Sequence, residues 1–287
     1  MKRALVLGGG GNVGIAWEIA VLASLLEGGL DTRDADLIVG TSAGSVVGTH
    51  VAHGRDLREL LSRQREEPAR SLPGSGPDMS ALTAIFTTWA QSEEMTPERC
   101  AEVGRMALAA KTMPEDDWLA GFAANEWPGW PETPLIVTAV DCESGELLAI
   151  DRASGVPIER ACAASCAVPG MFPPVTIDGR RYTDGGVRSG TSADLVQRIE
   201  PDRVLIVAPL GVSGRGVSRI MAKQLAREMG ELQGVGATVK LVQPQPDMMA
   251  AVGENFMDPS KRGEAADFGQ AQGAVLAGEL SSWWAGR

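Results

Sequence analysis

Basic residues, histidine and cysteine are all scarce in this chain of 287 residues. It has 26 Lys and Arg residues against 37 Asp and Glu residues, which gives a formal net charge of −11 at pH 7. Nucleic-acid binders need a basic face that displaces counterions from phosphates, so this balance argues against a nucleic-acid partner. It also argues against tight electrostatic docking on anionic lipid, although a local patch would still permit transient contact with a membrane surface.

The 4 cysteines, Cys100, Cys142, Cys162 and Cys166, include no CxxC pair. So few cysteines in a chain of this length are typical of reduced thiols packed inside a cytoplasmic protein. With only 2 histidines the chain has few ligands for zinc, and no stretch has the Asp-rich spacing of a calcium loop. We therefore expect neither a metal nor another cofactor.

Long apolar runs are absent as well. None approaches the ~18–20 residues that a membrane-spanning helix requires. The chain starts MKRALVLG, with two basic residues and a short apolar stretch, but glycines follow at once and no small-residue cleavage site appears. This start predicts a first β-strand rather than a signal peptide, and the whole pattern favours a cytoplasmic location.

The chain does have the alternation of strand and helix that is typical of α/β proteins. Short apolar runs at 4–7 and 37–39 are each followed by a helical pattern, and such short joints predict a parallel sheet with right-handed crossovers. We predict one domain over residues 1–287, a three-layer αβα fold with a mostly parallel central sheet. Further strands are predicted at 135–140, 146–150, 204–208 and 239–242, and a last helix at about 265–280.

A helical insertion is predicted at about residues 54–133, where helical patterns alternate with Pro and Gly breaks. Four of the seven tryptophans lie in it: Trp89, Trp118, Trp127 and Trp130. Two interpretations are open. Either the rings pack the inserted helices onto the sheet, or the Trp-rich loop at 127–131 caps an apolar substrate.

The sequence Gly40-Thr41-Ser42-Ala43-Gly44 has the form GxSxG and stands between a predicted strand and a predicted helix. A sharp strand-to-helix turn exposes the serine hydroxyl above the sheet, and glycines on either side remove side chains that would clash there. The same turn puts Ser42 at a helix N-terminus, where the helix dipole favours negative charge. We interpret Ser42 as a nucleophile, and Gly40 and Gly44 as the glycines of its elbow.

A second glycine-rich segment, Gly8-Gly9-Gly10-Gly11-Asn12-Val13-Gly14, joins the first predicted strand to the first helix. A dinucleotide fingerprint would need an acid at the end of the second strand, but Asp34 and Asp36 come before that strand. A Walker-type phosphate loop would need Gly-Lys-Ser/Thr, which is missing. The third interpretation is an oxyanion hole of unobstructed backbone N–H groups beside Ser42, and it accounts for both motifs together.

A serine nucleophile needs a base, and the two histidines are badly placed to supply it. His50 and His53 lie on the helix that starts at Ser42, and at ~1.5 Å per residue His50 is about 12 Å along the axis. A carboxylate or a lysine must therefore take the proton. The best candidate is Asp184, which ends a short predicted strand and precedes two glycines. Without Ser42 the same residue would indicate only a turn aspartate that caps its own loop.

These motifs together resemble the patatin-like phospholipases, a family of lipid acyl hydrolases that use a Ser–Asp dyad. The match consists of the glycine loop 9–14, the elbow 40–44 and the Asp184-Gly185-Gly186 turn, in the family's order. A fourth segment, 164–175, looks like the family's stretch ahead of its aspartate. The similarity is confined to about residues 4–53 and 134–210.

The resemblance implies a patatin-like fold and hydrolysis of a lipid or lipid-like acyl ester through an acyl-enzyme. Ser42 would be the nucleophile and Asp184 its base. The oxyanion hole would consist of backbone N–H groups, for which the candidates are Gly9, Gly10, Gly11 and Asn12. Beside a partly desolvated hydroxyl, we expect the pKa of the aspartate between about 4 and 6.

One position departs from the family pattern. The family's glycine loop usually has Arg or Lys just before its last glycine, and this chain has Val13. The missing cation argues against a phosphate-bearing substrate but leaves the backbone donors intact. Three other functions stay open: an acyltransferase that uses the same dyad, a nucleotide-binding regulatory module on the glycine loop, and an inactive lipid-binding relative.

Overall fold

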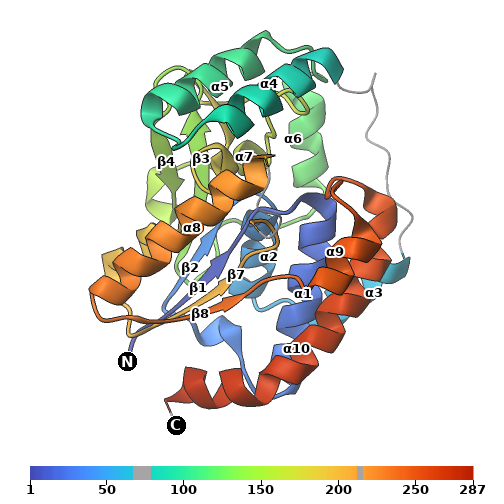
Figure 1. Ribbon diagram of the computed structural model, residues 1–287, viewed down its shortest axis with the longest axis vertical. Helices are drawn as coiled ribbons and strands as arrows, with labels where there is room; N and C mark the ends of the chain where they lie inside the picture. Colours follow the sequence, from blue (N-terminus) through green and yellow to red (C-terminus); the bar gives the residue numbers. More distant parts are fainter. Residues whose placement is uncertain (67–78, 212–215, 287) are drawn as a thin grey trace.

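In a computed structural model that describes residues 1–66, 79–211 and 216–286, an eight-stranded sheet runs between helices on both of its faces (Figure 1). The strands in these residues are β1 (Arg3–Leu7), β2 (Leu37–Gly40), β3 (Leu135–Asp141), β4 (Leu147–Ile150), β5 (Val175–Ile177), β6 (Arg180–Asp184), β7 (Arg203–Val207) and β8 (Thr238–Val242). The α-helices are α1 (Gly11–Glu27), α2 (Ala43–Ala52), α3 (Leu57–Glu66), α4 (Met79–Gln91), α5 (Pro97–Ala109), α6 (Glu115–Ala123), α7 (Ile158–Ser165), α8 (Gly216–Gly234), α9 (Pro246–Val252) and α10 (Arg262–Ala285).

The strand order is β5-β6-β3-β2-β1-β7-β8, with β4 paired to β3. Strands β3, β2, β1, β7 and β8 run parallel, whereas β4, β5 and β6 each pair antiparallel with their neighbours. The predicted three-layer α/β fold with a mostly parallel sheet is therefore confirmed. Strand β5 was not predicted, because its three residues are too few to show an alternation.

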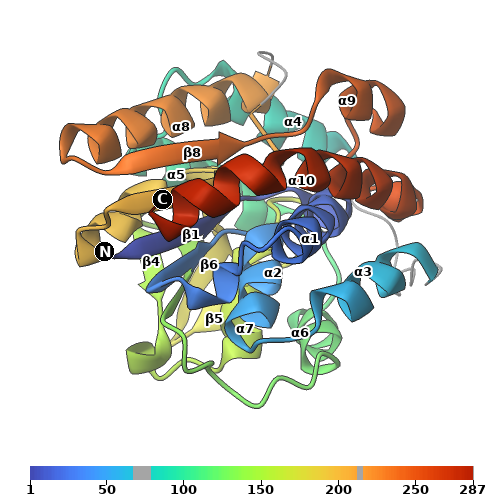
Figure 2. The same ribbon diagram turned by 90° about the horizontal axis from the view of Figure 1, so that it is seen from below.

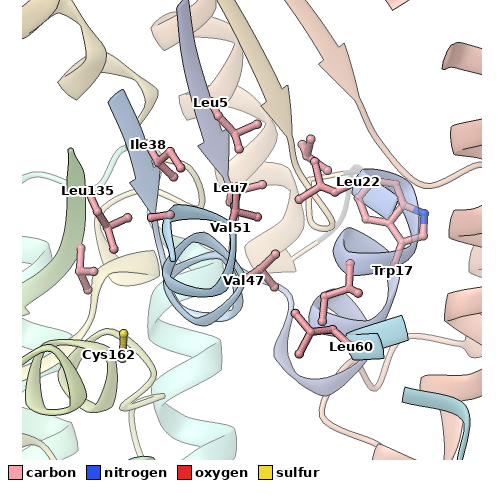
Figure 3. Close-up of a cluster of buried hydrophobic side chains, with 14 of the residues drawn as sticks. Leu5, Leu7, Trp17, Leu22, Ile38, Val47, Val51, Leu60, Leu135 and Cys162 are labelled. Carbon is pink, nitrogen blue, oxygen red and sulfur yellow. The ribbon is translucent and has the colours of Figure 1, made fainter. Parts of the chain in front are cut away.

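The central strands are buried on both faces, which is why they read as continuous apolar runs. In β1, Leu5 and Leu7 point into a cluster with α1 and α2, part of which is shown in Figure 3. Ala4 and Val6 point the other way, into a cluster with α8 and the short helix Ala193–Ile199. Seen from below, α1, α2 and α10 accordingly lie on one side of the sheet and α8 on the other (Figure 2).

Helix α10 lies along α1 (Figure 2). Two glycines let the helices approach closely, since a Cβ added at Gly269 would lie 2.7 Å from the carbonyl oxygen of Trp17. One added at Gly273 would lie 2.8 Å from the carbonyl oxygen of Val21. The contact holds the C-terminal part of the chain against the helix that begins in the glycine loop.

The helices predicted as an insertion pack in three places, and residues 67–78 of that segment lie outside the described residues. Helix α3 packs on α1 and α10, and α6 packs on α7. Helix α4 packs on α5 and α8, so that α4 and α5 lie together over the end of the sheet (Figure 1). Among these four helices, α4 is the one whose described residues reach the site.

Candidate active site

Ser42 stands at the turn between β2 and α2, with φ 53° and ψ −120°. A non-glycine residue in such a conformation costs of order 1–3 kcal/mol and is held by its surroundings. The flanking glycines are required by close packing. A Cβ added at Gly40 would lie 2.5 Å from the carbonyl oxygen of Gly44, and one at Gly44 would overlap the carbonyl oxygen of Leu7. The turn thus has the geometry of a nucleophile elbow.

The register of β3 brings Asp184 to Ser42. Strand β2 ends where Gly40 pairs with Val137, and β6 ends where Asp184 pairs with Ala139. Strand β4 pairs with residues 137–140 of β3 and so occupies its other edge. Strands β2 and β6 must therefore share one edge and meet with their C-terminal ends facing each other, which places the aspartate beside the elbow.

The carboxyl of Asp184 is 4% exposed. Burial raises its pKa to about 7, while hydrogen bonds from the Ser42 hydroxyl and the Gly186 N–H offset part of that rise. The Gly186 N–H donates to Oδ1 at 2.7 Å. The pKa lies above the range expected from the sequence because the side chain is fully enclosed rather than partly desolvated. A carboxylate with such a pKa is half ionised near neutral pH and is well matched to general-base catalysis.

The glycine loop offers fewer oxyanion donors than the sequence suggested. The Gly9 N–H donates to the carbonyl of Gly190 at 2.8 Å, so Gly9 cannot also serve an oxyanion and its assignment is wrong. Within the described part of the chain, the N–H groups of Gly10, Gly11 and Asn12 make no hydrogen bond. Gly10 and Gly11 line the cavity beside Ser42, whereas Asn12 does not. The donors best placed for an oxyanion are therefore those of Gly10 and Gly11, at the N-terminus of α1.

Asn12 has a different task. Its side-chain amide donates to the carbonyl of Met257 at 2.9 Å, and the neighbouring Val13 N–H donates to the carbonyl of Phe256 at 3.1 Å. The segment of Phe256 and Met257 also packs closely against Gly11 (φ +55°), where an added Cβ would lie 2.7 Å from the carbonyl oxygen of Phe256. The segment before α10 thus holds the glycine loop in place, a role that nothing in the sequence of 254–258 signals.

A second residue that supports the site, Ser165, was also not predicted from the sequence. The Ser42 N–H donates to Oγ of Ser165, at the end of α7, at 2.9 Å. The two residues are 123 positions apart in the chain. Ser165 falls in the segment 164–175 that resembles the family, but a hydrogen bond over such a separation leaves no local pattern in the sequence.

The two histidines lie away from the dyad, as the helix geometry required. The ring of His50 packs edge-on against Trp127, and His53 Nε2 lies 3.0 Å from the carbonyl oxygen of Gly129. Burial lowers the pKa of His50 to about 4 and also lowers the pKa of His53. Neither ring lines the cavity.

Ser42, Asp184, Gly10 and Gly11 share the wall of one cavity of about 870 Å³. This is in the upper range of small-molecule sites. Most of the other lining side chains are apolar and come from α4, α8 and the loops after α7, β7 and α9, among them Leu82, Phe86, Trp89, Met171, Met221 and Met257. The arrangement can therefore hold a long apolar group next to a serine, a carboxylate and two amide donors.

The loop at 127–131 does not cap this cavity. Trp127 is 5% exposed and belongs to the main core, and the Trp130 indole donates to the carbonyl of Val156 at 2.7 Å. Neither ring is part of the lining. These two tryptophans therefore pack, and the cap interpretation fails for their loop. The insertion reaches the substrate side through α4, which carries Phe86 and Trp89.

This division predicts opposite effects for two aromatic substitutions. Phe86→Ala removes a half-buried wall of the cavity and should lower kcat/KM for long-chain esters more than for short ones. Trp127→Ala should cost about 3–5 kcal/mol of stability, as is usual for a buried aromatic ring, and should affect both chain lengths equally. Thermal unfolding and ester hydrolysis at two chain lengths measure both effects. A chain-length preference altered by Trp127→Ala would contradict the assignment.

The described residues support neither a dinucleotide site nor a metal site, and they contain no membrane-spanning helix. Asp36 accepts from the Arg3 N–H at 2.7 Å at the N-terminal end of β2, opposite the glycine loop, so it does not stand at the C-terminal end of the strand where the acid of a dinucleotide site would hold a ribose. No group of three or more His, Cys, Asp or Glu side chains there is arranged to hold a metal ion. No helix in this part of the chain combines the length and the apolar character needed to cross a bilayer.

Comparison with known proteins matches this chain to one family and to several of its relatives. Residues 5–196 match the family described as patatin-like phospholipase. The lysophospholipase nte1 of Aspergillus fumigatus is 27% identical over 205 residues, which cover 71% of this chain and 12% of the fungal protein. An uncharacterized NTE family protein of Mycobacterium tuberculosis is 28% identical over 202 residues, which cover 68% of this chain and 47% of that protein.

The chain therefore spans less than half the length of these curated relatives. Among solved structures, VipD from Legionella pneumophila superimposes on 97% of this chain and 67% of its own chain, with a TM-score of 0.49 and 15% sequence identity.

Proposed function

The chain belongs to the patatin-like phospholipase family, and from that membership we propose that it is a serine hydrolase that cleaves carboxylic ester bonds of lipids or lipid-like acyl compounds. One observation carries the proposal. Ser42, Asp184 and the unpaired N–H groups of Gly10 and Gly11 line the same apolar cavity. The fungal relative's name, lysophospholipase, agrees with an acyl ester as the substrate.

The first half of the proposed reaction forms an acyl-enzyme. Asp184 takes the proton of Ser42 while Oγ attacks the carbonyl carbon of the ester. Negative charge then develops on the carbonyl oxygen, and the N–H groups of Gly10 and Gly11 donate to it, supported by the positive end of the α1 dipole. When the tetrahedral intermediate collapses, the alcohol leaves with the proton from Asp184 and the acyl group stays on Ser42.

The second half repeats these steps with water. Asp184 takes a proton from a water molecule that attacks the acyl carbonyl, and the same two N–H groups stabilise the second oxyanion. The carboxylic acid leaves when the proton returns to Oγ of Ser42. The raised pKa of Asp184 serves both halves of the reaction, because a carboxylate of low pKa would bind the transferred proton too weakly.

Labelling with a fluorophosphonate probe tests the proposal. Such a probe reacts with an activated serine, and we expect one adduct, on Ser42, that blocks hydrolysis of p-nitrophenyl esters in proportion to labelling. Peptide mass spectrometry locates the adduct. An adduct on another serine, or ester hydrolysis that survives full labelling of Ser42, would refute the assignment. Product analysis with an added alcohol, as acyl ester against free acid, distinguishes hydrolysis from acyl transfer.

A further inference from the structure

The charges around the cavity bear on which alcohol the acyl group is esterified to. Among the lining residues that the structure describes, Asp184 and Glu254 are the ionisable ones, and both are acids. No lysine or arginine of residues 1–66, 79–211 and 216–286 lines the cavity. The described part of the lining therefore contributes two carboxylates and no cation.

Two described bases that are close in sequence to lining residues are engaged elsewhere. Arg219 of α8 donates to the carbonyl of Ala90 at 3.4 Å. Lys261 donates to the carbonyl of Ala251 at 3.1 Å and pairs with Glu264 at 2.8 Å. Neither residue lines the cavity, and both side chains already hold acceptors, so neither is set to bind an anion inside it.

The glycine loop offers no cation either. Val13 is fully buried, and its N–H donates to the carbonyl of Phe256 at 3.1 Å. The positive ends of the α1 and α2 dipoles act only within their first turns. There they face Ser42 and the ester carbonyl. They can stabilise the oxyanion, but they are too far from a negatively charged group elsewhere on the substrate to stabilise its charge.

Glu254 is the second acid of the cavity lining. It is an exposed residue that also lines the cavity, which places it at the rim, and its carboxylate makes no ion pair with the described residues. At an effective dielectric between 20 and 80, two like charges about 8 Å apart disfavour each other by a factor of about 2 to 30. A cation in the same place is favoured by a similar factor.

We propose that this enzyme selects esters whose alcohol part is neutral or cationic and discriminates against esters that carry a phosphate or another anion, with Glu254 at the rim as the main source of the selection. The inference rests on the proposed ester hydrolysis and adds the substrate class. It separates this chain from a hydrolase whose cavity presents a cation to a phosphate.

Three water-soluble substrates with the same hexanoyl chain test the inference: the glycerol monoester, the choline ester and the glycerol phosphate monoester. At about pH 8 and low ionic strength, we expect kcat/KM for the first two to exceed that for the phosphate ester at least about tenfold. Glu254→Lys should raise the ratio of phosphate-ester to glycerol-ester turnover at least about fivefold. Added salt should weaken both effects, because screening shortens the reach of the charges.

Glu143→Lys is the matched control. It makes the same change in net charge at an exposed turn between β3 and β4 that does not line the cavity, and it should leave the ratio unchanged. Equal turnover of all three substrates, or equal effects of the two Lys variants, would overturn the inference while leaving ester hydrolysis intact. Failure to hydrolyse any of the three would instead count against the proposed function.

Discussion

Ser42→Ala is expected to lower kcat for a p-nitrophenyl ester by at least about 10⁴-fold, since the proposed acyl-enzyme forms on the Ser42 hydroxyl. The side chain is small and sits on a turn that its two glycines and the surrounding backbone hold in place, so the fold should survive. Circular dichroism and thermal unfolding verify the fold, and the fluorophosphonate probe should no longer react. Substantial turnover by the purified variant would remove Ser42 from the mechanism.

A glycine at the same position separates activity from stability. Ser42 holds φ at 53°, a conformation that glycine adopts without a steric cost. Ser42→Gly should therefore be as inactive as Ser42→Ala and unfold at a temperature no lower than the wild type, because relief of strain offsets the extra freedom of glycine in the unfolded chain. A marked loss of stability would mean that the elbow is not strained.

Asp184→Asn is the second substitution with a large expected effect. Asparagine keeps the shape of the side chain, and its Oδ1 can still accept from the Gly186 N–H. It cannot take a proton from Ser42 at neutral pH, so kcat should fall by about 10²–10⁴-fold, the usual contribution of a general base. Turnover near the wild-type rate would show that another residue activates the serine.

The pH profile of the wild type identifies the same group. The proposed mechanism requires ionised Asp184, and burial raises the pKa of this carboxyl to about 7, so kcat/KM should rise with pH through about 7. Burial lowers the pKa of His50 to about 4 and also lowers the pKa of His53, which moves the titration of both rings away from that inflection. The double variant His50→Gln, His53→Gln should keep both the activity and the inflection. A folded but inactive double variant would instead make a histidine the base.

Asp184→Asn should also change how stability depends on pH. Because the pKa of the carboxyl is raised in the folded state, the folded protein holds this proton up to about pH 7, while the unfolded chain releases it near pH 4. Stability is therefore lost as the pH rises from about 4 to about 7. Asparagine removes this loss, so the variant should melt at a higher temperature than the wild type at about pH 8, and the difference should vanish below about pH 4. A constant difference would argue against the raised pKa.

Much of this site follows from local sequence alone. The elbow at Ser42 and the glycine loop each combine a strand, a turn and a helix within a few residues, and short-range sterics decide such structures. The exclusion of the histidines is equally local, since the rise per residue of α2 fixes their distance from the serine. Parallel pairing of β1 and β2 then puts both motifs side by side, at the C-terminal ends of these two strands.

The errors fall where partners come from distant parts of the chain. Gly9 was taken as an oxyanion donor, but Gly190 accepts its N–H. Asn12 was placed in the same group, and its N–H makes no hydrogen bond with the described residues, but it does not line the cavity and its side chain binds the carbonyl of Met257. Long-range contacts also decided between the two interpretations left open for the loop at Trp127 and Trp130, which packs on the core instead of covering the substrate. In each case the residue type suited both a role in the site and a structural role. Contacts with residues distant in the sequence decided between the two.

The sequence by itself thus determined the layered α/β fold and pointed to Ser42 as the candidate nucleophile and Asp184 as the candidate base, because periodicity, glycine sterics and the scarcity of histidine act within short segments. Tertiary structure alone decided that β2 and β6 meet on one edge of β3, with Asp184 paired to Ala139 two residues beyond the end of β2 at Val137. It also decided the enclosure that raises the pKa of Asp184 to about 7. Strand register and burial depend on every element that packs around them, so no local pattern encodes either one.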